Sequence, residues 1–341
     1  MNRDSVFYSS VRTFFKSFAA MLGIIAGLVV IGIIIAIVAA PNHIPEKSNF
    51  YIAPDAMGNR TLLHSSTPAI LRIDISGIIG DGMLTSEKFE QILLDSREDL
   101  LSDNRVKGVL LYINTPGGVV TDADNMYRAL LAYKKKFNVP VYSFVDGLCA
   151  SGGMYIASAS DMVYATSASV IGSVGVILGP AFNFSTAMDK LGIQSKTLTQ
   201  GIDKDMLNPF RPWKEGEDKS LRDITAYLYQ QFVDIVVAGR KNLSRDKLVN
   251  EYGAQVYSGP RAQELGYVDE GDSNYAAALA ALTAACGIKG EYQVVKVEVQ
   301  RSLLSELAQG KLPFLTNKIT HTIDGAPNPK LSGRFLYLYQ P

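Results

Sequence analysis

The sequence predicts an α/β domain that follows a single N-terminal apolar helix. Through the middle of the chain, short apolar runs rich in β-branched residues alternate with longer segments whose apolar residues recur at helical spacing. This alternation of strand-like and helix-like segments is typical of α/β folds. With 341 residues, of which 47% are hydrophobic, the chain is long enough to bury a sizeable core.

The first element is an uncharged apolar stretch of about 23 residues, 18–40, which is long enough to cross the hydrocarbon core of a membrane. Basic residues precede it, so the positive-inside rule predicts that residues 1–17 lie in the cytoplasm and the bulk of the chain on the far side. The small residues at 38–40 also resemble a cleavage site, but the apolar region exceeds the usual length of a signal peptide. We therefore expect an uncleaved signal anchor.

The remaining chain divides into segments that differ in composition and hydrophobic periodicity. Residues 41–68 are polar, contain proline and lack periodicity, which indicates a linker. The α/β domain is expected over 69–300 and a C-terminal extension over 301–341, whose end, Phe335–Tyr339, is expected to add as a strand to a sheet edge or a neighbour. The expected strands are 69–75, 108–113, 141–145, 162–165, 195–199 and 292–299, and the expected helices are 85–101, 122–136, 221–240, 245–252, 260–265 and 275–285.

Charge and cysteine content exclude some classes of protein. The 33 basic and 33 acidic residues balance, and no basic run gives the electrostatic footprint of a nucleic-acid-binding protein. Two cysteines, Cys149 and Cys286, cannot build a disulfide framework; they could form one bridge or remain small buried apolar residues. The stretch I-G-S-V-G-V lacks the glycine spacing of a dinucleotide site, so no such cofactor is expected.

The most informative stretch, D-G-L-C-A-S-G-G-M-Y-I-A-S-A, begins where the apolar run 140–145 ends and continues into a small-residue segment. A strand that turns sharply into a helix at a serine exposes the nucleophile in several hydrolases, and here the serine is Ser151. The N–H group of Gly152 would then be available to an oxyanion. The spacing differs from G-x-S-x-G, and locally a small-residue helix start packed under a sheet fits equally well.

A serine nucleophile needs a base. The three histidines, His43, His64 and His321, all lie outside the α/β block, so a neutral lysine is the other option. Lys204 lies in G-I-D-K-D-M-L-N-P, a segment with the composition of a structured loop. Taken by itself it reads as a solvated loop lysine, and the neighbouring Asp203 and Asp205 would favour its charged form.

Two further stretches fit acyl chemistry. N-T-P-G-G at 114–118 follows a buried strand, and a backbone N–H there, paired with that of Gly152, would make a two-donor oxyanion hole. A simple strand-to-helix turn explains the same glycines. Ser173 is either a turn serine or a hydrogen-bond partner of the base.

Together, N-T-P-G-G, A-S-G-G-M-Y-I-A, I-G-S-V-G-V and the loop G-x-x-K-D-M-x-x-P occur in the order found in the signal peptide peptidase A and SohB family, which they resemble. The resemblance covers roughly 68–299 and includes V-Y-S-G-P-R-A-Q-E-L-G-Y-V-D at 256–269. It implies a membrane-anchored Ser-Lys serine endopeptidase with the crotonase and Clp protease-like spiral of β-β-α units. Thr115 departs modestly from the family, which often has serine there.

Carried over by motif, the resemblance implies that Ser151 is the nucleophile, Lys204 the general base and Ser173 the residue that orients it. The N–H groups of Gly118 and Gly152 would form the oxyanion hole, and the implied mechanism needs no metal or cofactor.

The resemblance also implies a ring-shaped homo-oligomer in which serine and lysine come from adjacent subunits. Implied substrates are signal-peptide remnants and other short or unfolded peptides. With the predicted anchor, this places the catalytic domain on the extracytoplasmic side of a bacterial inner membrane.

Two rival interpretations remain. A crotonase-like acyl-CoA enzyme would use the same fold and a similar oxyanion hole, but with an acidic base and no activated serine. A catalytically inactive membrane scaffold would keep the fold without hydrolysing peptides.

Overall fold

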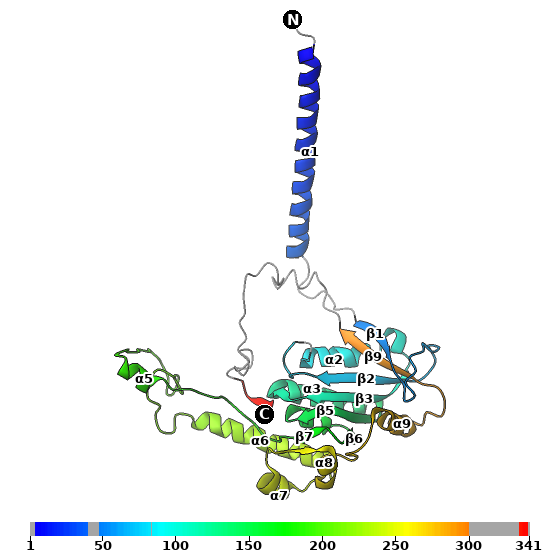
Figure 1. Ribbon diagram of the computed structural model, residues 1–341, viewed down its shortest axis with the longest axis vertical. Coiled ribbons are helices and arrows are strands. Elements are labelled where there is room, and N and C mark those ends of the chain that lie inside the picture. The colour runs from blue at the N-terminus through cyan, green and yellow to red at the C-terminus, as the bar shows by residue number, and fades with distance from the viewer. Residues whose placement is uncertain (1–3, 40–47, 83, 300–333, 340–341) are drawn as a thin grey trace. The chain divides into compact units, whose positions relative to one another are not determined.

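The computed structural model describes residues 4–39, 48–82, 84–299 and 334–339, and the chain forms two units (Figure 1). The first unit comprises 1–47 and 300–323, and the second comprises 48–299 and 324–341. In the first unit, helix α1 (Asp4–Ala39) contains a 26-residue apolar stretch, Phe7–Gly32, with a mean hydropathy of 2.2. By length and composition this helix could cross a membrane, which agrees with the predicted apolar helix, although α1 begins well before residue 18.

The second unit is built on a largely parallel sheet with the strand order β1-β9-β2-β3-β5-β7-β8, and β6 pairs with β5 beside β7. Among the described strands of this sheet, only the edge strands β1 and β8 run antiparallel to their neighbours. A two-stranded antiparallel sheet joins β10 to β4. The strands are β1 (Ser48–Ala53), β2 (Ala69–Ser76), β3 (Val106–Thr115), β4 (Gly117–Val119), β5 (Val141–Ala150), β6 (Met162–Ala165), β7 (Val170–Gly172), β8 (Val256–Ser258), β9 (Gln293–Val299) and β10 (Leu336–Leu338).

Helices cover both faces of the sheet (Figure 1). The larger core packs apolar residues of α2, α3, α4 and α6 against the central strands, and a smaller core lies beneath α9. These layers confirm the predicted α/β class. The helices are α2 (Ser86–Asp95), α3 (Val120–Phe137), α4 (Gly152–Ala157), α5 (Ser185–Lys190), α6 (Lys219–Gly239), α7 (Arg245–Lys247), α8 (Gly259–Leu265) and α9 (Tyr275–Ala285), with a 3₁₀ turn at Asp99–Leu101 and a π-helical turn at Leu248–Tyr252.

Two sequence-based predictions about secondary structure are wrong. The predicted linker 41–68 contains β1, which pairs along its whole length with β9. The partner strand lies more than two hundred residues away in the sequence, so local composition could not reveal the pairing. The predicted strand 195–199 is not a strand, because no other described strand lies beside it to satisfy its backbone groups.

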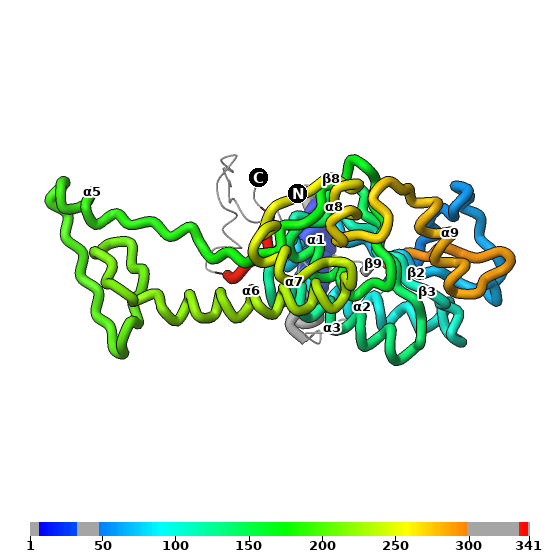
Figure 2. Tube along the Cα trace, turned by 90° about the horizontal axis from the view of Figure 1, so that it is seen from below, coloured from blue at the N-terminus to red at the C-terminus, as the bar shows by residue number. Residues whose placement is uncertain are grey.

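Between Ile177 and Asp218 the chain leaves the sheet as a long arm that carries α5 and then returns as α6 (Figures 1 and 2). The described part of the arm carries many large apolar side chains that are about half or more exposed. Those most exposed are Phe182, Phe184, Leu191, Ile193, Leu198, Ile202 and Phe210. An apolar surface of this extent on an extended segment is typical of a protein–protein contact.

Candidate active site

Ser151 occupies a strained turn between β5 and α4, as the sequence predicts. Its backbone angles are φ 53° and ψ −112°, a region that glycine adopts readily and other residues rarely do. The Ser151 N–H donates to the carbonyl of Gly172 at 2.9 Å, and the Tyr155 N–H donates to the Ser151 carbonyl at 3.0 Å. The side chain of Ser151 is only 1% exposed, and Oγ lies 3.5 Å from the carbonyl oxygen of Gly175. A strained backbone conformation that the surrounding structure maintains at a buried hydroxyl is typical of functional sites.

The glycine turn that carries Gly118 packs against Gly152, the other residue predicted for the oxyanion hole. A Cβ added to Gly118 would lie 2.0 Å from the Ile79 carbonyl oxygen, and one added to Gly117 would lie 2.6 Å from the Gly152 nitrogen. No side chain fits at either position, so the backbone of β4 lies directly against the first residue of α4. Thr115 shapes this turn: its hydroxyl donates to the carbonyl of Gly77 at 2.5 Å and accepts from the Gly117 N–H at 3.0 Å. A serine could make the same two bonds, so the threonine preserves the turn.

Ser173 lies one residue beyond the carbonyl that binds the Ser151 N–H, and it too has positive φ, at 54°. Its own N–H donates to Gln255 at 2.8 Å, and its side chain is 7% exposed. Within the described residues, no hydrogen bond joins its hydroxyl to Ser151 or to Lys204. Cys149 is free and buried, and burial raises the pKa of its thiol to about 12, so it is not an activated nucleophile. Cys286 is also free, so the two cysteines do not form the disulfide bridge that the sequence left open.

Lys204 lies on the arm, in a turn where its N–H is 3.4 Å from the Gly201 carbonyl oxygen. Its side chain is exposed and makes no hydrogen bond or ion pair with another described residue. The segment that carries it lies along the arm, away from the sheet (Figures 1 and 2). Within one chain, therefore, nothing in the described part joins Lys204 to Ser151.

An arginine missed by sequence reasoning organises the Lys204 loop. Arg211 binds both carboxylate oxygens of Asp205, at 2.8 and 3.0 Å, and donates to Glu217 at 2.7 Å. Glu217 in turn accepts the N–H of Leu207 at 3.1 Å. The hydrogen bond from Arg211 lowers the pKa of Asp205 and that of Glu217. Asp205 therefore pairs with the guanidinium of Arg211 and makes no ion pair with Lys204. The argument from sequence that Asp205 opposes a lysine base thus does not apply.

The histidines offer no alternative base among the described residues. His64 is exposed, and its Nδ1 is 2.9 Å from the hydroxyl of Ser66, two positions along the chain. His43 and His321 lie outside the described residues, as do the cleavage-site position Ala40 and most of the C-terminal extension.

The end of the chain confirms one prediction: β10 adds as a strand at the edge formed by β4. The pairs are Leu336 with Val119 and Tyr337 with Gly118. On its other side, the N–H and the carbonyl of Leu336 each bond with Ile177 at 3.0 Å. β10 therefore lies between two backbone edges, beside the predicted oxyanion hole.

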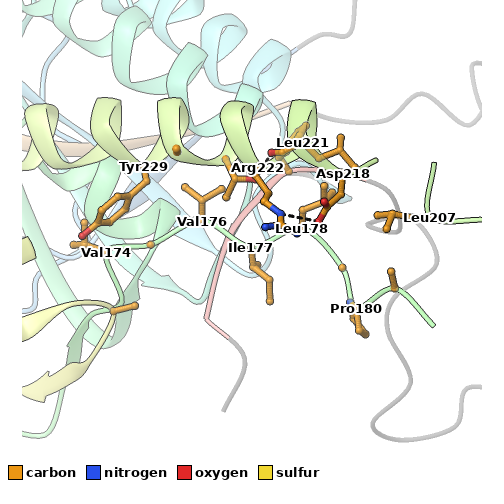
Figure 3. Close-up of a pocket in the computed structure, with 17 residues that line it drawn as sticks. Val174, Val176, Ile177, Leu178, Pro180, Leu207, Asp218, Leu221, Arg222 and Tyr229 are labelled. Carbon is orange, nitrogen blue, oxygen red and sulfur yellow. Dashed lines mark hydrogen bonds and ion pairs between the residues drawn. The ribbon is translucent and has the colours of Figure 1, made fainter. Parts of the chain in front are cut away.

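A groove of about 1050 Å³ continues from this region toward the base of the arm (Figure 3). One wall is the loop 174–181, which follows β7, and the other is the first half of α6 with Leu221 and Tyr229. Leu207, from the loop that carries Lys204, lies at the end opposite Tyr229 (Figure 3). Most of the lining side chains are apolar, and the Asp218–Arg222 ion pair, at 2.8 Å, is the charged exception drawn in Figure 3.

Comparison with known proteins finds related peptidases. The model of peptidase family S49 matches residues 133–288. Signal peptide peptidase SppA of Enterococcus faecium is 30% identical over 73% of this chain and 75% of that protein. Protease 4 of Haemophilus influenzae is 29% identical over 61% of this chain and 34% of that protein. The chain belongs to peptidase family S49.

The family assignment confirms the resemblance found in the sequence, and it supports a serine-type peptidase as the activity. Among solved structures, a ClpP1 mutant from Listeria monocytogenes is similar over 61% of this chain and 94% of that one, with a TM-score of 0.40 and 16% identity.

Proposed function

We propose that this chain is a membrane-anchored serine endopeptidase that cleaves short or unfolded peptides, including signal-peptide remnants, with Ser151 as nucleophile and Lys204 as general base. The observation that carries this proposal is the strained Ser151 turn, whose next residue, Gly152, packs against Gly117 of β4. A nucleophilic hydroxyl next to two backbone donors is the arrangement that acyl transfer requires.

In the proposed mechanism, neutral Lys204 takes the proton of the Ser151 hydroxyl as Oγ attacks a peptide carbonyl. The tetrahedral oxyanion accepts hydrogen bonds from the Gly118 and Gly152 amides. The protonated lysine then gives its proton to the leaving amine, and the peptide C–N bond breaks. Water, deprotonated by the same lysine, hydrolyses the acyl-enzyme and releases Ser151. Ser173 orients the lysine, and no cofactor takes part.

Lys204 reaches Ser151 from a neighbouring copy of the chain. Its exposure on an arm, together with the uncovered apolar side chains of that arm, supports an assembly in which each arm docks on another subunit. Docking would also strip water from the ammonium, which a lysine needs in order to act as a base. A closed ring satisfies every arm in this way.

The groove supports the proposed substrate class. Its apolar walls and the two backbone edges beside Ser151 suit an extended apolar peptide that binds by strand addition. Helix α1 would anchor the enzyme in the inner membrane, with the catalytic unit on the extracytoplasmic side, where such remnants arise.

Subunit complementation tests this proposal. Full-length Ser151→Ala and Lys204→Ala proteins, each purified in detergent, are assayed with an unstructured peptide library alone and after mixing with subunit exchange. Each alone is expected to be inactive, and the mixture is expected to regain activity, because some sites then hold a native serine and a neighbour's native lysine. Lys196→Ala, another exposed arm lysine, serves as the charge-matched control and should remain active.

Activity of the Lys204→Ala protein alone, with its oligomeric state intact, would remove Lys204 from the mechanism. If each variant is inactive and the mixture stays inactive despite verified exchange, the two residues do not combine across subunits.

A further inference from the structure

A groove between α2 and α3 takes no part in the proposed mechanism. The two helices pack side by side (Figure 1), and the α2–α3 groove has a volume of about 680 Å³. This volume lies within the range of about 300–1,000 Å³ that is typical of small-molecule sites. The apolar side chains that line the groove come from both helices and are Leu93, Leu94, Ala129, Ala132, Tyr133 and Phe137.

One guanidinium in this groove is partly buried without an anionic partner. Arg97, which follows α2, stacks on the rings of Tyr133 and Phe137, with Cζ 4.7 and 4.0 Å from the two ring centroids. Its Nη1 donates to the carbonyl of Val106 at 3.1 Å, but its Nε and Nη2 are buried and form no hydrogen bond with a described residue. It also makes no ion pair with a described carboxylate.

Two other partly buried arginines show what Arg97 lacks. Although burial lowers the pKa of Arg72, the carboxylate of Asp74, at 2.7 Å, raises that pKa overall. Arg105 donates from Nε, Nη1 and Nη2 to three backbone carbonyls. Burial lowers the pKa of the Arg97 guanidinium, and no carboxylate offsets this effect. A buried charge without a partner is costly, so an anion from outside the described chain would stabilise Arg97.

The two unpaired nitrogens of this guanidinium share one edge. The Nε–H group and one N–H group of Nη2 point in the same direction, which is the arrangement that binds both oxygens of a carboxylate. The rims of the groove limit the charge of the ligand. Lys136 and Arg128 line the α3 side, where Arg128 already pairs with Asp124 at 2.7 Å. Glu90 and Glu98 line the α2 side and disfavour a ligand with several negative charges.

We propose that the α2–α3 groove binds an amphiphilic monocarboxylate of the fatty-acid class, with its carboxylate on the Nε–Nη2 edge of Arg97 and its chain along the apolar floor. Binding turns the guanidinium toward the groove, since the two nitrogens are buried against protein atoms in the unliganded chain. An extended peptide fits less well, because two helices that satisfy their own backbone groups offer no strand edge to its N–H groups. Helix α1, which could cross a membrane, would keep the chain where such amphiphiles concentrate.

Photoaffinity labelling tests this site. Full-length protein in phosphatidylcholine nanodiscs is irradiated with a dodecanoate probe that carries a diazirine at the end of its chain, and the labelled peptides are mapped. Peptides of α2 and α3 that line the groove are expected to be labelled, and labelling of α1 by probe dissolved in the lipid serves as the internal reference. Excess dodecanoate should compete with the labelling of the groove, whereas dodecanol at the same concentration should not, because it lacks the carboxylate that Arg97 binds.

Three variants locate the site. Arg97→Met keeps an unbranched stem against Tyr133 and Phe137 but removes the charge, so the protein should stay folded and labelling of the groove should fall at least about tenfold. Ala132→Trp leaves Arg97 intact but fills the groove, and it should also abolish the labelling. Lys135→Ala removes an exposed charge of α3 outside the groove, so it is the matched control and should be labelled like the wild type.

Equal competition by dodecanol, unchanged labelling of the Arg97→Met protein, or labelling of α1 alone in the wild type would overturn the proposal. Competition by an amphipathic helical peptide with one glutamate, but not by dodecanoate, would assign the groove to a protein partner and overturn it as well. None of these measurements requires peptide hydrolysis, so their outcome is independent of the roles proposed for Ser151 and Lys204.

Discussion

The turn at Ser151 and the arm that carries Lys204 are built by opposite means. Around Ser151, glycines at 117, 118 and 152 bring three backbone segments into contact, and every residue of α4 is buried. On the arm, Lys204 is exposed, and the loop is held mainly by the ion pairs of Arg211 with Asp205 and Glu217. One chain thus preorganises the proposed nucleophile and the proposed oxyanion donors but leaves the proposed base away from them.

This difference explains how a strained serine can persist in a single chain. A residue with unfavourable backbone angles costs about 1–3 kcal/mol and needs surroundings that over-determine it. The packed sheet and helices around Ser151, which we call the body, supply such surroundings. A strained residue on the arm, which has few buried contacts, would relax to a favourable backbone conformation. A base delivered by an arm needs less internal rigidity if another subunit positions it on docking.

The largest effect is expected from Gly118→Ala in the body. The added Cβ would lie 2.0 Å from the Ile79 carbonyl oxygen, so β4 must shift away and carry its N–H group with it. Loss of one oxyanion donor costs about 10²–10³-fold in kcat, and the overpacking should lower the unfolding free energy by roughly 2 kcal/mol. Peptide hydrolysis and urea denaturation measure the two effects.

Gly290→Ala is the control for this change, because a Cβ there meets nothing within 4 Å. It should leave both quantities unchanged. Near-normal turnover of the Gly118→Ala protein would show that the N–H of Gly118 is not one of the catalytic donors.

The difference between the Ser151 turn and the arm also explains which features could be predicted from the sequence. The Ser151 turn was predictable because its causes are local: a β-branched strand, one serine and a run of small residues lie next to each other. The parallel strands were predictable for the same reason. The roles proposed for Ser173 and the glycines rest on motif order, since spacing alone left them as turn residues.

Long-range pairing was not visible. β1 depends on β9, and the buried ring of Tyr337 packs against Tyr155 of α4 and Phe232 of α6, both far away in the sequence. Arg211 gave no periodic or motif signal; a basic residue six positions after Asp205, followed by Glu217, was the only hint. Contacts that a single chain does not make, such as the proposed approach of Lys204 to Ser151, produce no local pattern in the sequence.

An intermediate effect is expected from Arg211→Ala on the arm. The variant removes every side-chain bond that ties Asp205 to Glu217, so the Lys204 loop loses its geometry. Misplacing a catalytic group should reduce kcat/KM by about tenfold or more. The only tryptophan, Trp213, donates to the Asn208 carbonyl at 3.1 Å within this loop, and its emission should shift to the red.

Arg261→Ala is the matched control, because Arg261 makes a largely exposed ion pair with Glu264 outside the groove, and such pairs contribute little. It should leave activity and Trp213 emission close to those of the wild type. A loss of body stability in Arg211→Ala equal to that in Gly118→Ala would mean that the arm and the body unfold together, and the contrast between them would fail.

The smallest effect concerns the strain at Ser151 and compares two inactive variants, Ser151→Gly and Ser151→Ala. Both remove the hydroxyl, but only glycine adopts φ 53° and ψ −112° without steric cost. Relief of strain outweighs the larger entropy that glycine gains on unfolding, so Ser151→Gly should be more stable than Ser151→Ala by about 1 kcal/mol. Urea denaturation with equal m-values measures the difference. Equal stability would mean that the surroundings do not hold Ser151 under strain, and the body would then owe its preorganisation to packing alone.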